Sequence, residues 1–92
     1  MKLGTAIQQP AERLSYTINY ASALTDGDNI ESAYATVSPT GLTVENVSTM
    51  DPKVRFWVTG GTPDVTYKVT ITTNTTDGRV FQDEVIFRIR DI

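Results

Sequence analysis

The feature that most constrains this chain is the stretch from Val54 to Arg90, in which apolar residues recur at every second position. Side chains of a β-strand point alternately to the two faces of a sheet, so such a segment offers one face to a core. Glycine-containing turns divide the stretch into three segments of this kind, which predicts a small antiparallel β domain. The alternating positions are Val54, Phe56, Val58, Tyr67, Val69, Ile71, Val85, Phe87 and Ile89.

The rest of the chain supplies further strand-like segments. Residues 14–20 alternate well, residues 30–37 alternate weakly, and residues 42–47 form a short segment before Pro52. Residues 53–59, 65–74 and 80–89 complete the set, and Asp77-Gly78 is a strong hairpin signal. No helical periodicity is sustained. The pattern predicts an all-β fold, an antiparallel immunoglobulin-like β-sandwich of about six or seven strands, with a small barrel as the alternative.

A chain of 92 residues fits a single domain. Residues 1–13 have little pattern and contain Pro10, so we expect an N-terminal arm, extended or at a sheet edge, followed by the sandwich at residues 14–92. The predicted core consists of Leu14, Tyr16, Ile18, Ile30, Leu42, Phe56, Val58, Tyr67, Val69, Ile71, Val85, Phe87 and Ile89.

The composition excludes much of the usual catalytic chemistry. The chain has no histidine and no cysteine, which removes Ser-His-Asp and Cys-His catalysis and most zinc sites. Asp26 and Asp28 lie close together and could bind Ca²⁺, but two carboxylates are too few for a dedicated site. An Asx-type turn explains them better. We therefore expect no enzyme activity, no catalytic residues, no metal and no cofactor.

The charge and hydropathy patterns limit which kinds of partner and which cellular location we expect for the chain. The net charge is −3 with both signs scattered, so no basic surface for direct binding of nucleic acid is expected. No apolar run is long enough for a signal peptide or a membrane helix. Because folding without cysteine needs no oxidising compartment, synthesis in the cytoplasm is the simplest interpretation.

Trp57 is the residue that most suggests a protein partner. If Val54, Phe56 and Val58 face the core, Arg55 and Trp57 face away from it, and an exposed Trp beside an Arg is typical of a binding hot spot. Alternatively, the ring packs flat over cross-strand neighbours or under a loop. The N-terminal arm offers a second contact surface, so the candidate interface residues are Ile7, Pro10, Arg55 and Trp57.

Five segments of the chain carry a resemblance to known proteins: residues 10–20, 24–30, 41–43, 56–62 and 67–79. In this order and spacing, they resemble a family of small tailed-bacteriophage virion proteins described as phage fiber-tail adaptor proteins. The resemblance covers about residues 8 to 90, and no single motif in it is diagnostic. One departure is visible at residues 33–39, where Tyr34 and Ser38 change the family's register before Gly41.

The resemblance implies a non-enzymatic structural protein in the neck or tail of a virion. Several copies would surround a symmetric core and link tail or fiber components to other virion proteins, after synthesis in the host cytoplasm. The alternative from a different class is a cell-surface adhesion or carbohydrate-binding β-sandwich module. Such a module would be expected to carry clustered exposed aromatic residues, and only Trp57 partly meets that expectation.

Overall fold

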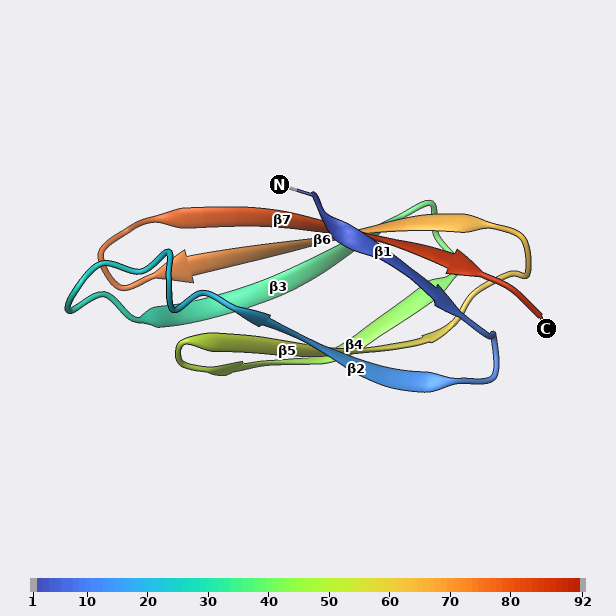
Figure 1. The fold of residues 1–92 in the computed structure, drawn as a ribbon, viewed down its shortest axis with the longest axis horizontal. Helices are drawn as coiled ribbons and strands as arrows, with labels where there is room; N and C mark the ends of the chain where they lie inside the picture. Colours follow the sequence, from blue (N-terminus) through green and yellow to red (C-terminus); the bar gives the residue numbers. More distant parts are fainter. Residues whose placement is uncertain (1, 92) are drawn as a thin grey trace.

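The computed structural model describes residues 2–91, which form seven β-strands in two sheets (Figure 1). The predicted all-β sandwich is thereby confirmed. No helix in the described part of the chain is long and apolar enough to cross a membrane. The strands are β1 (Lys2–Gln8), β2 (Arg13–Asn19), β3 (Ile30–Ser38), β4 (Leu42–Met50), β5 (Lys53–Gly60), β6 (Thr66–Thr75) and β7 (Val80–Ile89).

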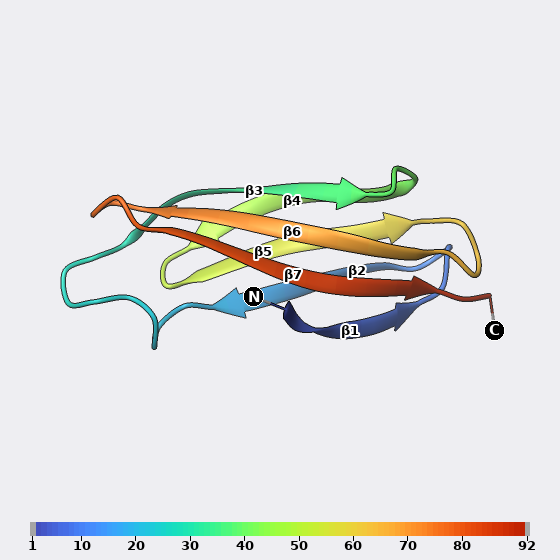
Figure 2. The ribbon, with the colours of Figure 1, turned by 90° about the horizontal axis from the view of Figure 1, so that it is seen from above.

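The strand order is that of an immunoglobulin-like sandwich. One sheet has the order β1-β7-β6-β3 and the other β2-β5-β4, so the chain repeatedly crosses between layers (Figure 2). Neighbouring strands are antiparallel except β1 and β7, which run parallel. The first strand therefore joins the sheet that contains the last strand.

A tyrosine near the start of β6 fixes the corner between β5 and β6. The Tyr67 hydroxyl accepts a hydrogen bond of 2.8 Å from the backbone N–H of Thr62, five residues upstream, as in the tyrosine corner of immunoglobulin-like domains. The ring also explains Gly41, whose φ is +128° and at which an added Cβ would lie 3.0 Å from the Tyr67 hydroxyl. A side chain at residue 41 would therefore be strained and crowded.

The core lies between the sheets and follows the period-two pattern. Phe56 and Phe87 are completely buried, and Tyr16 packs on both, with ring centroids 5.9 Å and 5.0 Å away. Leu14 was wrongly predicted as core: its side chain is 41% exposed, because β2 is an edge strand and no further strand covers this position. Two other residues of the predicted core, Tyr16 and Val85, are half-buried. Val54 and Tyr20 are buried, although the predicted core did not include them.

Residues 2–12 lie along the sandwich as an edge strand and a turn. β1 pairs with β7 from Lys2↔Glu84 to Gln8↔Ile89. Gln8 is 1% exposed, and its side-chain amide donates to the backbone oxygens of Val58, at 2.9 Å, and Glu12, at 3.0 Å. Gln8 therefore joins the end of β1 to the opposite sheet.

The third predicted segment was too short. β4 continues to Met50, and its pairing with β5 shifts register between Glu45 and Ser48. Asn46 has φ = 51°, a left-handed conformation that Asn tolerates better than most residues. This bulge breaks the alternation of the sequence while the strand itself continues.

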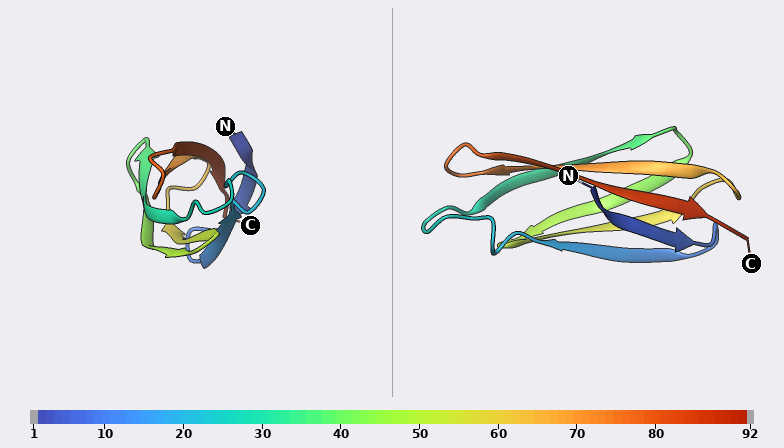
Figure 3. Two further views of the ribbon diagram at one scale, coloured as in Figure 1. Left: turned by 90° about the vertical axis from the view of Figure 1, so that its left-hand side faces the viewer. Right: turned by 45° about the horizontal axis from the view of Figure 1, so that its top comes forward.

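The sandwich is elongated, with extents of 45 × 19 × 19 Å, and its two long sides differ. On the closed side, the edge strands β3 and β4 contact each other. On the open side, the edges of β1 and β2 belong to different sheets, and no described backbone ladder joins them. The view along the long axis places the two sides opposite one another (Figure 3, left).

Candidate protein interface

The outer face of the three-stranded sheet carries Trp57 at its centre. Val54, Phe56 and Val58 of β5 are buried, so the residues between them face outward. β5 is the middle strand, and Trp57 lies opposite Ser15 of β2 and Glu45 of β4 in the two registers. The predicted outward orientation of Arg55 and Trp57 agrees with this arrangement.

Trp57 is half-buried beneath charged neighbours. The Arg13 guanidinium lies 4.3 Å from the ring centroid and that of Arg55 lies 5.9 Å from it. Arg13 also forms an exposed ion pair with Glu45, at 2.9 Å from Nε to Oε1. We call these four residues the Trp57 face. Each such exposed contact is worth only about 0.5–1 kcal/mol, but together they hold the ring and its cations in one arrangement.

Arg55 is the least satisfied member of the Trp57 face. Within residues 2–91, its Nε is the only buried side-chain nitrogen or oxygen without a hydrogen-bond partner. A buried donor left without an acceptor costs about 1–3 kcal/mol. The Trp57 face therefore has an unused donor next to its aromatic ring.

The other two candidate residues lie elsewhere. Ile7 is 59% exposed on β1 and pairs in register with Arg88, so it faces outward from the four-stranded sheet. Pro10 lies in the turn between β1 and β2. Ile7 and Trp57 are consequently on opposite faces of the sandwich and cannot form one patch. The sequence did not reveal this, because it did not show which sheet the N-terminal segment joins.

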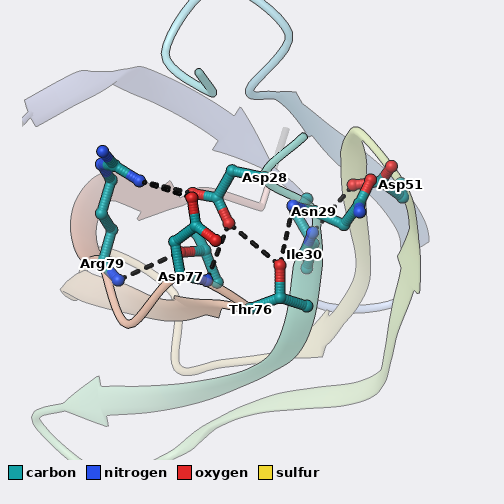
Figure 4. Close-up of polar contacts among 8 residues, drawn as sticks. Asp28, Asn29, Ile30, Asp51, Thr76, Asp77 and Arg79 are labelled. Atoms are coloured by element: carbon teal, nitrogen blue, oxygen red, sulfur yellow. Dashed lines mark hydrogen bonds and ion pairs between the residues drawn. The ribbon is translucent and has the colours of Figure 1, made fainter. Parts of the chain in front are cut away.

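Asp28, considered above as a calcium ligand, is engaged within the protein at the end of the sandwich (Figure 4). Its carboxylate accepts hydrogen bonds from the Thr76 hydroxyl at 3.1 Å and the Asp77 N–H at 3.0 Å, and it pairs with Arg79 at 3.1 Å. Burial alone would raise the pKa of Asp28, but hydrogen bonds from Asp77, Thr75, Thr76 and Arg79 lower it below the usual value.

These contacts join loops that are far apart in the sequence. The Asp28 carboxylate ties the β2–β3 connection to the β6–β7 turn, and the Asp51 carboxylate accepts a 2.8 Å hydrogen bond from the N–H of Ile30. In the described residues, no group of three or more His, Cys, Asp or Glu side chains could hold a metal ion. The loop cluster therefore has an evident structural role.

The geometry is that of a small immunoglobulin-like sandwich with a charged aromatic cluster on one face. Comparison with known families is consistent with this class: residues 8–88 match the family described as podophage GP4 fiber-tail adaptor protein gp77. The chain belongs to this family of phage tail structural proteins. No curated protein matches the chain.

Proposed function

We propose that the protein is a non-enzymatic adaptor at the neck or tail of the virion, linking tail or fiber components to other virion proteins. Several copies act together in a symmetric assembly, which adds avidity to contacts that are individually weak. The net charge of −3 argues against direct binding to nucleic acid, and synthesis takes place in the host cytoplasm.

The observation that carries the proposal is the Trp57 face. Trp and Arg are enriched among residues that dominate binding energy, particularly at the centre of an interface. Here the ring lies on the middle strand of its sheet, with the Arg13 and Arg55 guanidinium groups beside it. A partner that offers carboxylates or backbone carbonyls over the Trp57 face would pair with these guanidinium groups and enclose the indole beneath them.

The opposite face supports a linking role. Ile7 is exposed on the other sheet and Pro10 lies in the adjoining turn, so a second partner there would not compete with one on Trp57. Two contact surfaces on opposite sides of one rigid domain are what an adaptor requires.

The carbohydrate-binding alternative is disfavoured by the position of Arg13. Sugars stack on the open face of an aromatic ring, whereas the Arg13 guanidinium lies 4.3 Å from the Trp57 ring centroid. Tyr34, another exposed aromatic residue, is on β3 in the other sheet and so is not beside Trp57.

The test is incorporation of variants into phage particles. The gene is replaced by Trp57→Ala, and copies of the protein per particle are counted by quantitative mass spectrometry. Loss of a hot-spot residue weakens binding about thirtyfold, so we expect strongly reduced copy number. Tyr34→Ala removes a comparable exposed aromatic and should leave copy number unchanged. Full incorporation of a folded Trp57→Ala protein would refute the proposed contact.

A further inference from the structure

An apolar groove follows the open side between β1 and β2. One cavity of about 250 Å³ and another of about 150 Å³ lie along it, and Leu3 and Ile18 line both. The larger is further lined by Gly4, Ala6, Tyr16 and Val85. A Cβ placed on Gly4 would meet nothing within 4 Å, so small residues on β1 leave space in the groove.

The backbone along this groove is suited to an extended chain. β1 hydrogen-bonds to β7 alone and β2 to β5 alone within the described sheets. Each edge strand thus directs a row of unpaired N–H and C=O groups to its free side. An added strand satisfies such groups at their regular spacing and places every second side chain in the groove.

Gln8 closes one end of the groove, and Asp83 lies at the other end. The Tyr16 hydroxyl donates to Gln8 Oε1 at 2.8 Å, which bridges β2 and β1. At the opposite end, the described pairing of β1 with β7 begins at Glu84, beyond Phe81 and Asp83. Those two residues line the smaller cavity together with Leu3 of β1.

Asp83 gives this end of the groove a preference for a positively charged group. The residue is only 5% exposed, and its Oδ2 accepts a 2.6 Å hydrogen bond from the Tyr20 hydroxyl. No Lys or Arg among residues 2–91 forms an ion pair with it, whereas the equally buried Asp28 is paired with Arg79. A buried carboxylate without a cation is costly.

We propose that the open side binds an extended segment of a neighbouring virion protein, and that Asp83 pairs with a Lys or Arg side chain of that segment. The apolar stem of the basic side chain packs against Leu3 and Phe81 while its charged end reaches the carboxylate. The inference rests on the proposed adaptor role, and it names a contact surface separate from the Trp57 face.

The probe is an array of overlapping twelve-residue peptides that covers the other virion proteins of the phage. Bound peptides should alternate apolar and polar residues and contain a Lys or Arg. Replacing that residue by Gln should weaken binding about tenfold or more, because the carboxylate is again left without a cation. In Asp83→Asn, the Lys and Gln peptides should bind alike, and NMR shifts on binding should map to β1 and β2.

Three variants separate the possible outcomes. Glu84→Gln removes a neighbouring carboxylate that already pairs with Lys68, and it should bind the peptides normally. Gly4→Ile fills the groove and should abolish binding with an unchanged melting temperature. Trp57→Ala should bind the peptides normally. The peptide experiment therefore tests the groove independently of the particle experiment that tests the Trp57 contact.

Each of several results would overturn the inference. These are the absence of any bound peptide, equal binding of the Lys and Gln peptides to the unmodified protein, or NMR shifts confined to β3 and β4. Self-association that Gly4→Ile abolishes would show that a second copy of this chain occupies the groove instead.

Discussion

The closed and open sides of the sandwich have the same alternating sequence pattern, but their apolar side chains differ in how far they are exposed to solvent. On the closed side, Ile30 and Leu42 are 8% and 6% exposed because β3 and β4 lie against each other. On the open side, Leu3 and Leu14 are 42% and 41% exposed. The chain leaves large apolar side chains of its edge strands more exposed on the open side, which is why we place a partner there.

Phe87→Ala should have the largest effect on stability. The ring is fully buried and meets Tyr16 of β2 edge-on at 5.0 Å, so it links the centre of the core to the open side. Urea unfolding should show a loss of about 3–5 kcal/mol in the free energy of unfolding. A loss below about 1 kcal/mol would contradict this prediction, because it would mean that neighbouring side chains fill the cavity left by the Phe87 ring.

Two matched leucines test the comparison directly. Leu42 and Leu14 occupy the two edge strands of the same sheet, opposite Gly60 and Val58 of β5. Leu42→Ala should cost about 2–5 kcal/mol in urea unfolding, as for a buried leucine, and Leu14→Ala less than about 1 kcal/mol. Equal losses would contradict the distinction between closed and open sides.

Gln8→Ala should selectively loosen the open side. The substitution leaves the buried backbone oxygen of Val58 without its side-chain donor, which costs about 1–3 kcal/mol. Hydrogen exchange should accelerate in β1 more than in β3. The control is Thr5→Ala, an exposed substitution on the same strand. Unchanged hydrogen exchange of β1 in Gln8→Ala would show that the Gln8 hydrogen bonds do not hold this strand in place.

Asp28→Asn should have an effect on stability that depends on pH. Asp28 holds the connection that runs from β2 on the open side to β3 on the closed side. Its folded-state pKa is below the usual 3.8, so its stabilisation is complete above that value and is lost as pH falls through the folded-state pKa. Melting temperatures of the two proteins should therefore converge in acid; a constant difference would exclude this linkage.

The fold was largely predictable because two-residue periodicity directly encodes the faces of buried strands. Residues 80–89 were predicted with the observed bounds of β7, and most predicted core positions are buried. The predictions failed where long-range pairing decides the outcome. Leu14 has the periodicity of a core residue but lies on an edge strand. The bulge at Asn46 interrupts the alternation, so the sequence pattern did not indicate the second half of β4.

The interface was less predictable than the fold. The outward orientation of Trp57 follows from its neighbours in β5, but the Arg13 that covers it is more than forty residues away in the sequence. Asp83 was missed as a site residue, because a carboxylate in a strand usually faces solvent. The alternation of Val85, Phe87 and Ile89 nevertheless extends to Asp83, and its pairing with Ile71 agrees that this residue is on the inner face.

The parallel pairing of β1 with β7 has a mechanical consequence. Because both strands run in the same direction, tension that separates the start of β1 from the end of β7 loads their hydrogen bonds in shear, all at once. An antiparallel terminal hairpin pulled in the same way would unzip one bond at a time. Resistance to force depends on the unfolding rate and not on equilibrium stability, so this pairing can hold under load even in a small domain.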